Sequence, residues 1–366
     1  MTPNTSGINW SVGSTGLVEW RPTGTYSYVE IYYSKDNFGT DSHLLKTVSN
    51  VASGDLGSTQ CDVPNDVSKT VRIRVWDKDD PDVKEISGYD LNIIGSIEVT
   101  EPETASLVWK VGETGKKIKW NSTGKITNVK IEYKTSAGGG YTTIVADDPG
   151  HNTEGPNEYT WTDSVTGGVA DANAEDCYIR VSDANNLTLV SNVSTIPFSI
   201  RPLITVTPPA LNQNIKVGSA NNTVSWNCNS SYVSKVDIYY SKTGEGGTFD
   251  KLINSGIVCS KGDNSYTAWG PVADDISDDV VIKVRDKSND IINNNVFGLS
   301  ASFDIIGQIT MHPVDNTPNV NSNWQVGSTD KYVTWSHKGN LGNVNIRYKH
   351  DGGAYSSPIN PSPIPV

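Results

Sequence analysis

The sequence predicts an all-β protein of tandem two-sheet sandwiches that follow one another in an extended rod. The first observation is a repeated motif: an aromatic or aliphatic residue, Val-Gly after one position, a polar turn, and a run ending in Trp. It occurs four times at a spacing of roughly 100 residues, which is typical of a repeat array. Second, an alternating strand pattern follows each motif; third, no long segment has a helical period. The copies are Trp10–Trp20, Trp109–Trp120, Ile215–Trp226 and Trp324–Trp335.

Each motif is followed by a run in which apolar residues take every second position. Such alternation is typical of a strand with one face buried and the other face in water. The polar residues between the apolar ones are therefore expected to face solvent. The four runs are Val29–Tyr33, Val129–Tyr133, Val236–Tyr240 and Val344–Tyr348.

Further short strands complete each unit. A short aromatic strand is expected at Tyr159–Trp161 and Tyr266–Trp269, with Cys61–Val63 as the poorer match in the first copy. A second alternating strand and a closing strand follow at Val71–Val75, Tyr178–Val181, Val280–Val284, Leu91–Ile94, Phe198–Ile200 and Phe303–Ile306. About seven strands per unit, with turn signals every ~8–12 residues, are the pattern of an immunoglobulin-like β-sandwich.

The Trp that ends each motif and the Tyr that ends the next strand are most simply core residues. Trp and Tyr bury large areas, and their polar tips can reach a partner at a sheet edge. Stacking on a ligand is the alternative role. The predicted core residues are Trp20, Trp120, Trp226, Trp335, Tyr33, Tyr133, Tyr240 and Tyr348.

The links between the units are very short. Ile94-Gly95-Ser96 and Ile306-Gly307-Gln308 are nearly the same junction, and the middle junction is Arg201-Pro202-Leu203. Links of this length, one of them stiffened by Pro, restrict the movement of one domain against the next. This predicts a semi-rigid rod of four repeats, at residues 1–95, 96–202, 203–307 and 308–366.

The first and last repeats are predicted to be incomplete. The second repeat opens with a strand that runs into Pro102, whereas Met1 aligns with Thr100, so the first repeat lacks its opening strand. The fourth repeat has that strand but about half of the others are absent. Open edges and an apolar sheet face need a cover. Either the chain is a window on a longer repeat protein, or one chain's end supplies strands to the next. The Pro-rich tail at 358–365 could lie along an edge.

Composition restricts the function. The chain has 41 acidic and 29 basic residues and a net charge of −12, which argues against a nucleic-acid partner because phosphates require clustered Lys and Arg. No apolar run approaches the roughly 18 residues of a membrane span, and the first residues do not resemble a signal peptide. The abundance of Asn, Ser, Thr and Gly, with 10 Trp and 16 Tyr, suits strands and turns outside the cytosol.

The four cysteines do not recur at equivalent positions of the repeats. Cys228 and Cys259 fall in one repeat, and we predict that they form a disulfide. Cys61 and Cys177 lie in different repeats and are expected to stay free. No CxxC or Cys/His spacing indicates a zinc site.

An acidic cluster is the strongest sign of a cofactor. Asp77, Asp79, Asp80 and Asp82 follow a predicted strand of the first repeat, and grouped carboxylate oxygens could hold Ca²⁺. The alternative is that Asp favours turns and keeps a rod soluble. No other cofactor is expected. No Walker loop, nucleophile elbow or dinucleotide fingerprint is present in the sequence, so the chain is predicted not to be an enzyme.

The order W-x-V-G…I-x-W, V-x-I-x-Y, Y-x-W and I-x-V-x-D resembles the Ig-like repeat of Ser/Thr-rich GPI-anchored and fungal cell-wall glucan-assembly proteins. It is also similar to repeats of very large bacterial and archaeal surface proteins. The likeness covers essentially the whole chain and rests on core and turn positions. It implies a secreted or surface-exposed sandwich and supplies no catalytic residues. The chain lacks the family's GPI-type tail and Ser/Thr-rich stalk.

We therefore expect a non-catalytic extracellular structural protein, such as a surface rod, adhesin stalk or filament subunit. Its partner would be another copy of itself or the rest of a longer repeat chain. The rival is a carbohydrate-binding or adhesive module whose exposed aromatic residues stack on cell-surface glycans, which clustering on one face would favour. A third interpretation is an accessory region of a secreted enzyme. The aromatic candidates are Tyr32, Trp76, Tyr232 and Tyr239.

Overall fold

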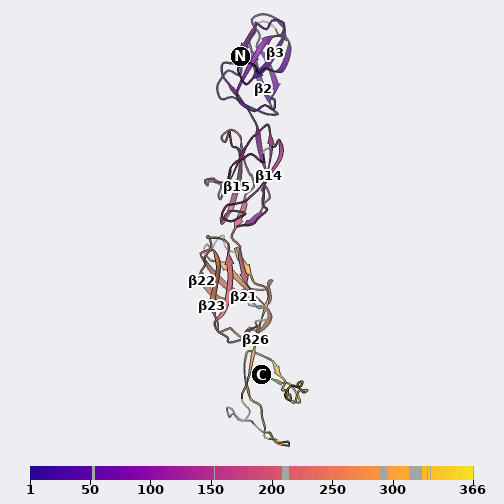
Figure 1. Cartoon of the computed structure of the whole chain (residues 1–366), viewed down its shortest axis with the longest axis vertical. Coiled ribbons are helices and arrows are strands. Elements are labelled where there is room, and N and C mark those ends of the chain that lie inside the picture. Colours follow the sequence, from indigo (N-terminus) through magenta and orange to yellow (C-terminus); the bar gives the residue numbers. More distant parts are fainter. Residues whose placement is uncertain are drawn as a thin grey trace. The chain divides into compact units, whose positions relative to one another are not determined.

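A computed structural model gives the fold, and its regular secondary structure is entirely β-strand in the part of the chain that it describes. Two compact units are present, Met1–Ile200 and Arg201–Val366, and each contains two of the predicted repeats (Figure 1). Every sheet pairs strands from within one predicted repeat. The described residues are 1–51, 54–151, 153–207, 214–287, 296–312, 324–327, 329 and 331–365.

The second repeat contains two facing sheets. The larger sheet has the order β10 (Val108–Lys110), β17 (Phe198–Arg201), β15 (Ala174–Asp183), β12 (Val129–Lys134) and β13 (Thr142–Asp148), with β16 (Ser191–Val193) beside β15. The smaller sheet has the order β14 (Gly155–Thr160), β11 (Lys117–Thr123) and β9 (Ser96–Glu101). The chain crosses between the two sheets several times, with β9, β11 and β14 in the smaller sheet and the strands between and after them in the larger one, as in an immunoglobulin-like sandwich.

The third repeat has the same strand order. Its larger sheet runs β19 (Ile215–Lys216), β26 (Phe303–Ile306), β24 (Ser277–Asp286), β21 (Lys235–Ser241) and β22 (Lys251–Val258), with β25 (Phe297–Leu299) beside β24. Its smaller sheet runs β18 (Ile204–Thr207), β20 (Asn222–Cys228) and β23 (Gly262–Trp269). The short strand β19 runs parallel to the closing strand β26, so the motif residue Ile215 joins the larger sheet.

The first repeat differs only in its smaller sheet. Its larger sheet runs β1 (Asn9–Ser11), β8 (Leu91–Ile94), β6 (Ser68–Asp77), β3 (Tyr26–Ser34) and β4 (His43–Val51), with β7 (Lys84–Ile86) beside β6. Its smaller sheet consists of β2 (Thr15–Trp20) and β5 (Gly57–Asp62). A single bridge between Thr2 and Glu19 stands where the other two repeats have a full strand.

The described part of the fourth repeat contains two separate pairs of strands. β27 (Gln308–Met311) pairs with β28 (Trp335–Lys338), and β29 (Asn343–Val344) pairs with β30 (Ile364–Pro365). The Pro-rich tail therefore contacts an edge within its own repeat. The Val-Gly turn of the fourth motif and the opening Pro313 fall partly outside the described residues.

Each of the first three repeats has its own apolar core. The alternation of the strands decides which side chains enter it: Val129, Ile131 and Tyr133 of β12 point inward, and β11 supplies Trp120 from the opposite sheet. Trp109 packs edge-on to Trp161 at a centroid distance of 5.8 Å, a geometry that aromatic pairs prefer. The predicted fold class, tandem immunoglobulin-like sandwiches, is confirmed by this strand order.

Candidate interaction site

The motif residues take different positions in complete and incomplete repeats. Trp20, Trp120 and Trp226 of the smaller sheets and Tyr33, Tyr133 and Tyr240 of the larger sheets are all buried. In the fourth repeat, Trp335 is partly exposed and Tyr348 is 55% exposed. The core prediction is wrong for Tyr348, because the described residues of that repeat provide no facing sheet to cover it.

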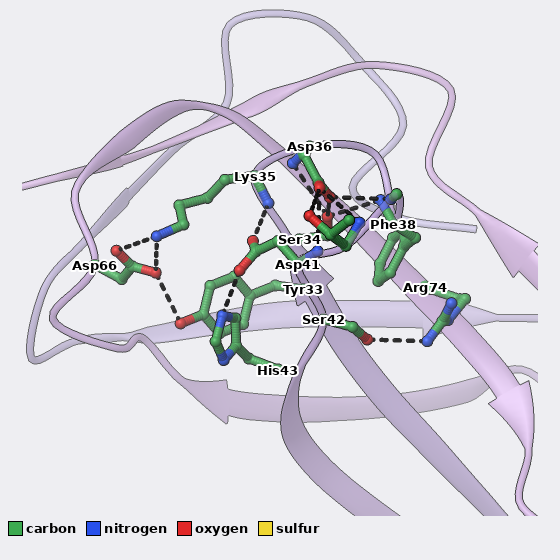
Figure 2. A network of polar contacts seen from close by, with 12 residues as sticks. Tyr33, Ser34, Lys35, Asp36, Phe38, Asp41, Ser42, His43, Asp66 and Arg74 are labelled. Atoms are coloured by element: carbon green, nitrogen blue, oxygen red, sulfur yellow. Dashed lines mark hydrogen bonds and ion pairs between the residues drawn. The ribbon is translucent and has the colours of Figure 1, made fainter.

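The buried Tyr of the first and third repeats is bonded to an Asp from a distant turn. In the first repeat, the Tyr33 hydroxyl donates to Asp66 (3.1 Å), and Lys35 Nζ lies 2.8 Å from the same carboxylate (Figure 2). In the third repeat, Tyr240 donates to Asp275 (2.6 Å). Burial and the bond to Asp66 raise the pKa of Tyr33 to about 12. Each Tyr–Asp bond ties the end of a core strand to the turn before β6 or β24.

The loop after β3 is held by two further carboxylates (Figure 2). Asp36 accepts hydrogen bonds from the backbone amides of Gly39 and Thr40, at 3.0 and 2.7 Å. Asp41 accepts the backbone amide of Lys35 at 2.6 Å. The bonds from Thr40 and its neighbours hold the pKa of Asp36 well below its usual range. These carboxylates are therefore used to fix the loop.

The outer face of the larger sheet in the first repeat carries a compact group of aromatic and charged residues. Tyr32 and Trp76 meet edge-on at a centroid distance of 5.0 Å. The Arg74 guanidinium lies 4.2 Å from the Trp76 ring and 4.1 Å from Phe38. Trp76 Nε1 donates to Glu30 (3.2 Å). The group combines cation–π contacts with a hydrogen bond across neighbouring strands.

The matching faces of the second and third repeats use ion pairs at the same strands. Arg180 donates to Glu132 at 2.6 and 2.9 Å, and Arg285 donates to Asp237 at 3.3 Å. Burial would raise the pKa of Glu132, but the bonds from Lys130 and Arg180 lower it below the ordinary value. In all three repeats, a carboxylate on this face accepts a hydrogen bond from a cross-strand neighbour.

The aromatic residues suggested as sugar platforms are divided between repeats. Tyr32 and Trp76 lie together in the first repeat, as described above. Tyr239 takes the place of Tyr32 on β21 of the third repeat, where Arg285 lies 5.4 Å from its ring. Tyr232 precedes that strand and is exposed. Clustering therefore occurs within the first repeat for two of the four candidates.

The predicted disulfide partners lie together in the third repeat as free, buried thiols. Cys228 and Cys259 are hydrogen-bonded to each other, and Trp226 Nε1 donates to Cys259 Sγ at 3.3 Å. The bond to Cys259, reinforced by burial, raises the pKa of Cys228. The disulfide between Cys228 and Cys259 therefore stays a prediction. Cys61 and Cys177 are also buried, and neither forms a disulfide in the structure.

The predicted calcium loop forms local turns. The backbone amide of Asp79 donates to Asp77 at 3.0 Å, and that of Asp82 donates to Asp80 at 3.1 Å. Among the described residues, no three His, Cys, Asp or Glu side chains converge on a common point suited to a metal ion. Calcium binding remains a prediction, and isothermal titration with CaCl₂ would test it.

The smaller sheet of the first repeat has an open edge. Thr2 and Glu19 exchange both backbone hydrogen bonds, at 2.7 and 3.1 Å. Alternate residues of a strand bond to the same side, so the N–H and C=O of Arg21 point to the same edge as those of Glu19. Among the described residues no strand pairs with Arg21. In the second repeat this edge is occupied along its length by β9, with Val99 opposite Trp120.

A pocket of about 550 Å³ lies at this open edge. Side chains from both sheets line it, with apolar residues such as Val29 and Val75 beside charged ones such as Lys84. In the second repeat, Trp120, Ile126, Val129 and Val181 stand at the positions of Trp20, Tyr26, Val29 and Val75 and belong to the core. The lining includes Met1, Trp20, Thr23, Tyr26, Val29 and Val75.

Comparisons with known protein families and curated proteins give no match. No family model matches the chain, and no curated protein matches it. The likeness to glucan-assembly repeats therefore remains a resemblance of pattern. The described residues also include no helix with the length and hydrophobicity to cross a membrane.

Among solved structures, the chain is similar to tandem immunoglobulin domains. The complex of Dpr2 Ig1-Ig2 with DIP-Theta Ig1-Ig3 matches with 13% identity over 83% of this chain and 97% of that chain, with a TM-score of 0.24. Sidekick-1 immunoglobulin domains 1-4 match with 12% identity over 85% and 76%, at 0.20. The insect immune protein hemolin matches with 11% identity over 83% and 75%, at 0.24. At these scores the fold assignment rests on the strand order.

Proposed function

We propose that the chain is a non-catalytic structural repeat protein of the cell exterior, a surface rod, adhesin stalk or filament subunit whose copies join end to end by strand complementation. The observation that carries the proposal is a contrast within the molecule. Carboxylates on the outer faces of the first three repeats accept hydrogen bonds from cross-strand neighbours. In contrast, among the described residues no strand pairs with Arg21 of the first repeat, and Ile309 and Met311 of the fourth repeat are exposed. Open edges of this kind are where strands of another chain add.

The composition supports the same proposal. A net charge of −12 keeps a repeat array soluble and disfavours non-specific binding to nucleic acid. The short, glycine-containing junctions limit how far successive repeats can move against each other. A protein built from such units suits a spacer or a polymer more than a catalyst.

Sedimentation and electron microscopy of the full chain test the proposal. We expect assemblies that grow with protein concentration, and images of filaments with a spacing near the length of one chain. A variant lacking residues 309–366 should remain monomeric. Polymerisation of that variant at the wild-type level would refute joining through the fourth repeat, and antibody labelling of intact source cells would test the location.

A carbohydrate-binding or adhesive module is the second candidate. It is favoured by the clustering of Tyr32 and Trp76 on the outer face of the first repeat, since Tyr and Trp can present an apolar ring and a polar tip to a partner. Glycan-array binding that is lost in Trp76→Ala, and kept in a matched Tyr239→Ala variant, would support it. An accessory role beside a catalytic domain would require that domain in a longer form of the protein.

A further inference from the structure

A cation stands at the same position of the larger sheet in each of the first three repeats. Arg74 of β6, Arg180 of β15 and Lys283 of β24 each lie between an Ile and a Val of the core. Residues that are directly opposed on neighbouring strands have their side chains on the same face of the sheet. The opposed pairs on the outer face are Tyr32–Arg74, Glu132–Arg180 and Tyr239–Lys283.

In the second repeat, the residue opposite the cation is a carboxylate that pairs with it. Arg180 donates two hydrogen bonds to Glu132, at 2.9 and 2.6 Å. Lys130 Nζ lies 2.7 Å from the other oxygen of the same carboxylate. The ring of Tyr141, which lies just before β13, covers the guanidinium at 3.6 Å. The protein itself therefore supplies an anion to this cation.

In the first repeat, aromatic rings take the place of that carboxylate. The Arg74 guanidinium lies 4.1 Å from the centre of the Phe38 ring and 4.2 Å from that of Trp76. Its Nη2 donates to Ser42 Oγ at 3.0 Å (Figure 2). Among the described residues, Nη1 has no hydrogen-bond partner and Nε is buried without one. Cation–π contacts stabilise the charge but leave most of the five N–H donors of an arginine unused.

The carboxylate on this face of the first repeat is bound to other groups. Glu30 accepts hydrogen bonds from Trp76 Nε1 at 3.2 Å and from the Tyr32 hydroxyl at 3.0 Å. Lys78 Nζ lies 3.9 Å from its other oxygen. In the described part of the chain, no ion pair joins Arg74 to Glu30 or to another carboxylate. Arg74 therefore presents a charge that the protein leaves unpaired.

Phe38 is held beside Arg74 in an unusual backbone conformation. Asn37 and Phe38 have φ angles of 56° and 61°, in the left-handed region that bulky residues rarely adopt. The Phe38 amide donates to Ser34 Oγ at 2.7 Å, and the Asp36 carboxylate fixes the residues that follow. Such conformations persist where surrounding contacts enforce them, and they are frequent at ligand sites. The loop thus places an aromatic ring against the cation.

The third repeat has the same arrangement around a lysine. Lys283 Nζ lies 4.1 Å from the centre of the Phe297 ring and 5.3 Å from that of Phe249, which belongs to the loop between β21 and β22. Asp237, the carboxylate on this face, pairs with Arg285 instead. Within the described residues, no carboxylate pairs with Lys283. Burial, together with the charge of Arg285, lowers the pKa of Lys283, so an anion from outside would stabilise its charged form.

We propose that Arg74 and Lys283 are binding sites for the carboxylates of an acidic polysaccharide built from uronic-acid sugars. This inference rests on the second proposed function, carbohydrate binding, and names the ligand class and the residues that recognise it. The ligand carboxylate would accept a hydrogen bond from Arg74 Nη1, as Glu132 accepts from Arg180 in the second repeat. Charge-assisted bonds of this kind are stronger than neutral ones. Phe38 and Phe297 would contact the apolar faces of the sugar rings.

A polyuronate fits these sites better than a nucleic acid does. Each site has one unpaired cation beside a protein carboxylate, Glu30 or Asp237, whereas phosphate chains require clustered Lys and Arg. The aromatic rings add apolar contact that a sugar ring can use. Because every sugar of a polyuronate carries a carboxylate, sites in separate repeats can bind one polymer without a fixed spacing between them.

Isothermal titration of the full chain tests the ligand class. The probe is an oligomer of galacturonic acid, and its control is the same oligomer with methyl-esterified carboxylates. We expect the acid form to bind, and its binding to weaken as NaCl is added, since salt screens exposed charges. The ester lacks the charge and should bind at least about tenfold more weakly.

Two double variants test the residues. Arg74→Gln with Lys283→Gln removes both cations. Tyr32→Glu with Tyr239→Glu keeps the cations and places a carboxylate opposite each, as the second repeat does with Glu132. Both variants change the net charge by the same amount, and both should weaken binding of the acid oligomer at least about tenfold.

The matched control removes the same charge from another face. Lys117→Gln with Lys119→Gln alters β11 in the smaller sheet of the second repeat, where both lysines make exposed ion pairs. Such pairs contribute little to stability, so this variant should bind within about twofold of wild type. Unchanged hydrogen exchange of β3 and β21 would verify that each variant remains folded.

The outcomes separate this inference from the proposed functions. Preference for the acid form, lost in both site variants and kept in the control, supports it. Equal binding of acid and ester, or site variants that bind like wild type, overturns it and leaves carbohydrate binding to be decided by the glycan array. Equal binding of single-stranded DNA, with the same losses, overturns the choice of a polysaccharide. A chain that binds neither oligomer overturns the two sites without bearing on self-association, which sedimentation measures.

Discussion

The carboxylate of Asp275 should be a major local determinant of stability in the third repeat. It is 6% exposed and accepts the Tyr240 hydroxyl at 2.6 Å. Lys242 and Lys251 lie 3.3 and 3.5 Å away. In Asp275→Ala, the buried hydroxyl of Tyr240 loses its acceptor, and the two lysines lose their counter-charge. Asp66 of the first repeat makes the matching bond to Tyr33 and provides a natural comparison.

The magnitude follows from these contacts. A hydrogen bond to a charged group contributes about 1.5–3 kcal/mol, and the half-exposed lysines add at most about 1 kcal/mol. We therefore expect Asp275→Ala to cost about 2–4 kcal/mol. The side chain of Asp66 is 29% exposed, against 8% for Asp275, so water can replace part of its bond. Asp66→Ala should cost about 1 kcal/mol.

Native-state hydrogen exchange of the full chain, read by mass spectrometry, can measure the two losses separately. Protection of β21 and β24 should fall about 30-fold or more in Asp275→Ala, because each 1.4 kcal/mol is tenfold. Protection of β3 and β6 should fall about fivefold in Asp66→Ala. Asp275→Asn keeps an acceptor and should fall between wild type and alanine. Equal losses in the two alanine variants, or unchanged exchange in β21, would refute the assignment.

Three further predictions concern other buried polar groups. Because the pKa of Tyr33 is raised to about 12, the Tyr33 hydroxyl contributes its full stabilisation below the unfolded pKa of about 10. This stabilisation is lost as the pH rises through about 12. Urea unfolding across this range should show the loss, and Tyr33→Phe should abolish this pH dependence. The lowered pKa of Glu132 gives stability above about pH 4.3 that is lost as the pH falls, so Glu132→Gln should reduce stability at pH 7 by about 1–3 kcal/mol and flatten the acid limb of the unfolding curve. Oxidation by diamide should join Cys228 to Cys259, with loss of two hydrogen atoms in the peptide mass; two intact thiols after unfolding would contradict the predicted bond.

Local periodicity predicted the strands because burial of one strand face requires apolar residues at every second position. Val129, Ile131 and Tyr133 alternate with polar residues and are buried together, so inward and outward faces could be assigned before the structure. The same reasoning predicted which strand closes each repeat, since Leu91–Ile94 has the pattern and becomes β8. Turn spacing then restricted the fold to a sandwich.

Partners across the sheets could not be predicted in this way. Asp66 lies 33 residues after Tyr33, and Asp275 lies 35 residues after Tyr240, so only a comparison of the repeats could have linked them. The Arg74 stack on Trp76 depends on strand register, which periodicity does not give. Tyr348 has the same pattern as Tyr240, yet it is exposed, because burial also depends on a sheet supplied by other residues.

Trp20 and Trp120 show how far a shared motif can predict the surroundings of a residue. Their strands and motifs are alike, and both side chains are buried. Trp120 has a complete neighbouring strand with Val99 opposite it. Trp20 lines a pocket of about 550 Å³, and no strand in the described part of the chain pairs with Arg21 next to it. Under the proposed strand complementation, a strand entering beside Trp20 would add backbone hydrogen bonds and apolar contacts to the first repeat. Binding at that edge is thus coupled to folding of the repeat that receives it, and this coupling would make assembly and stability rise together with concentration.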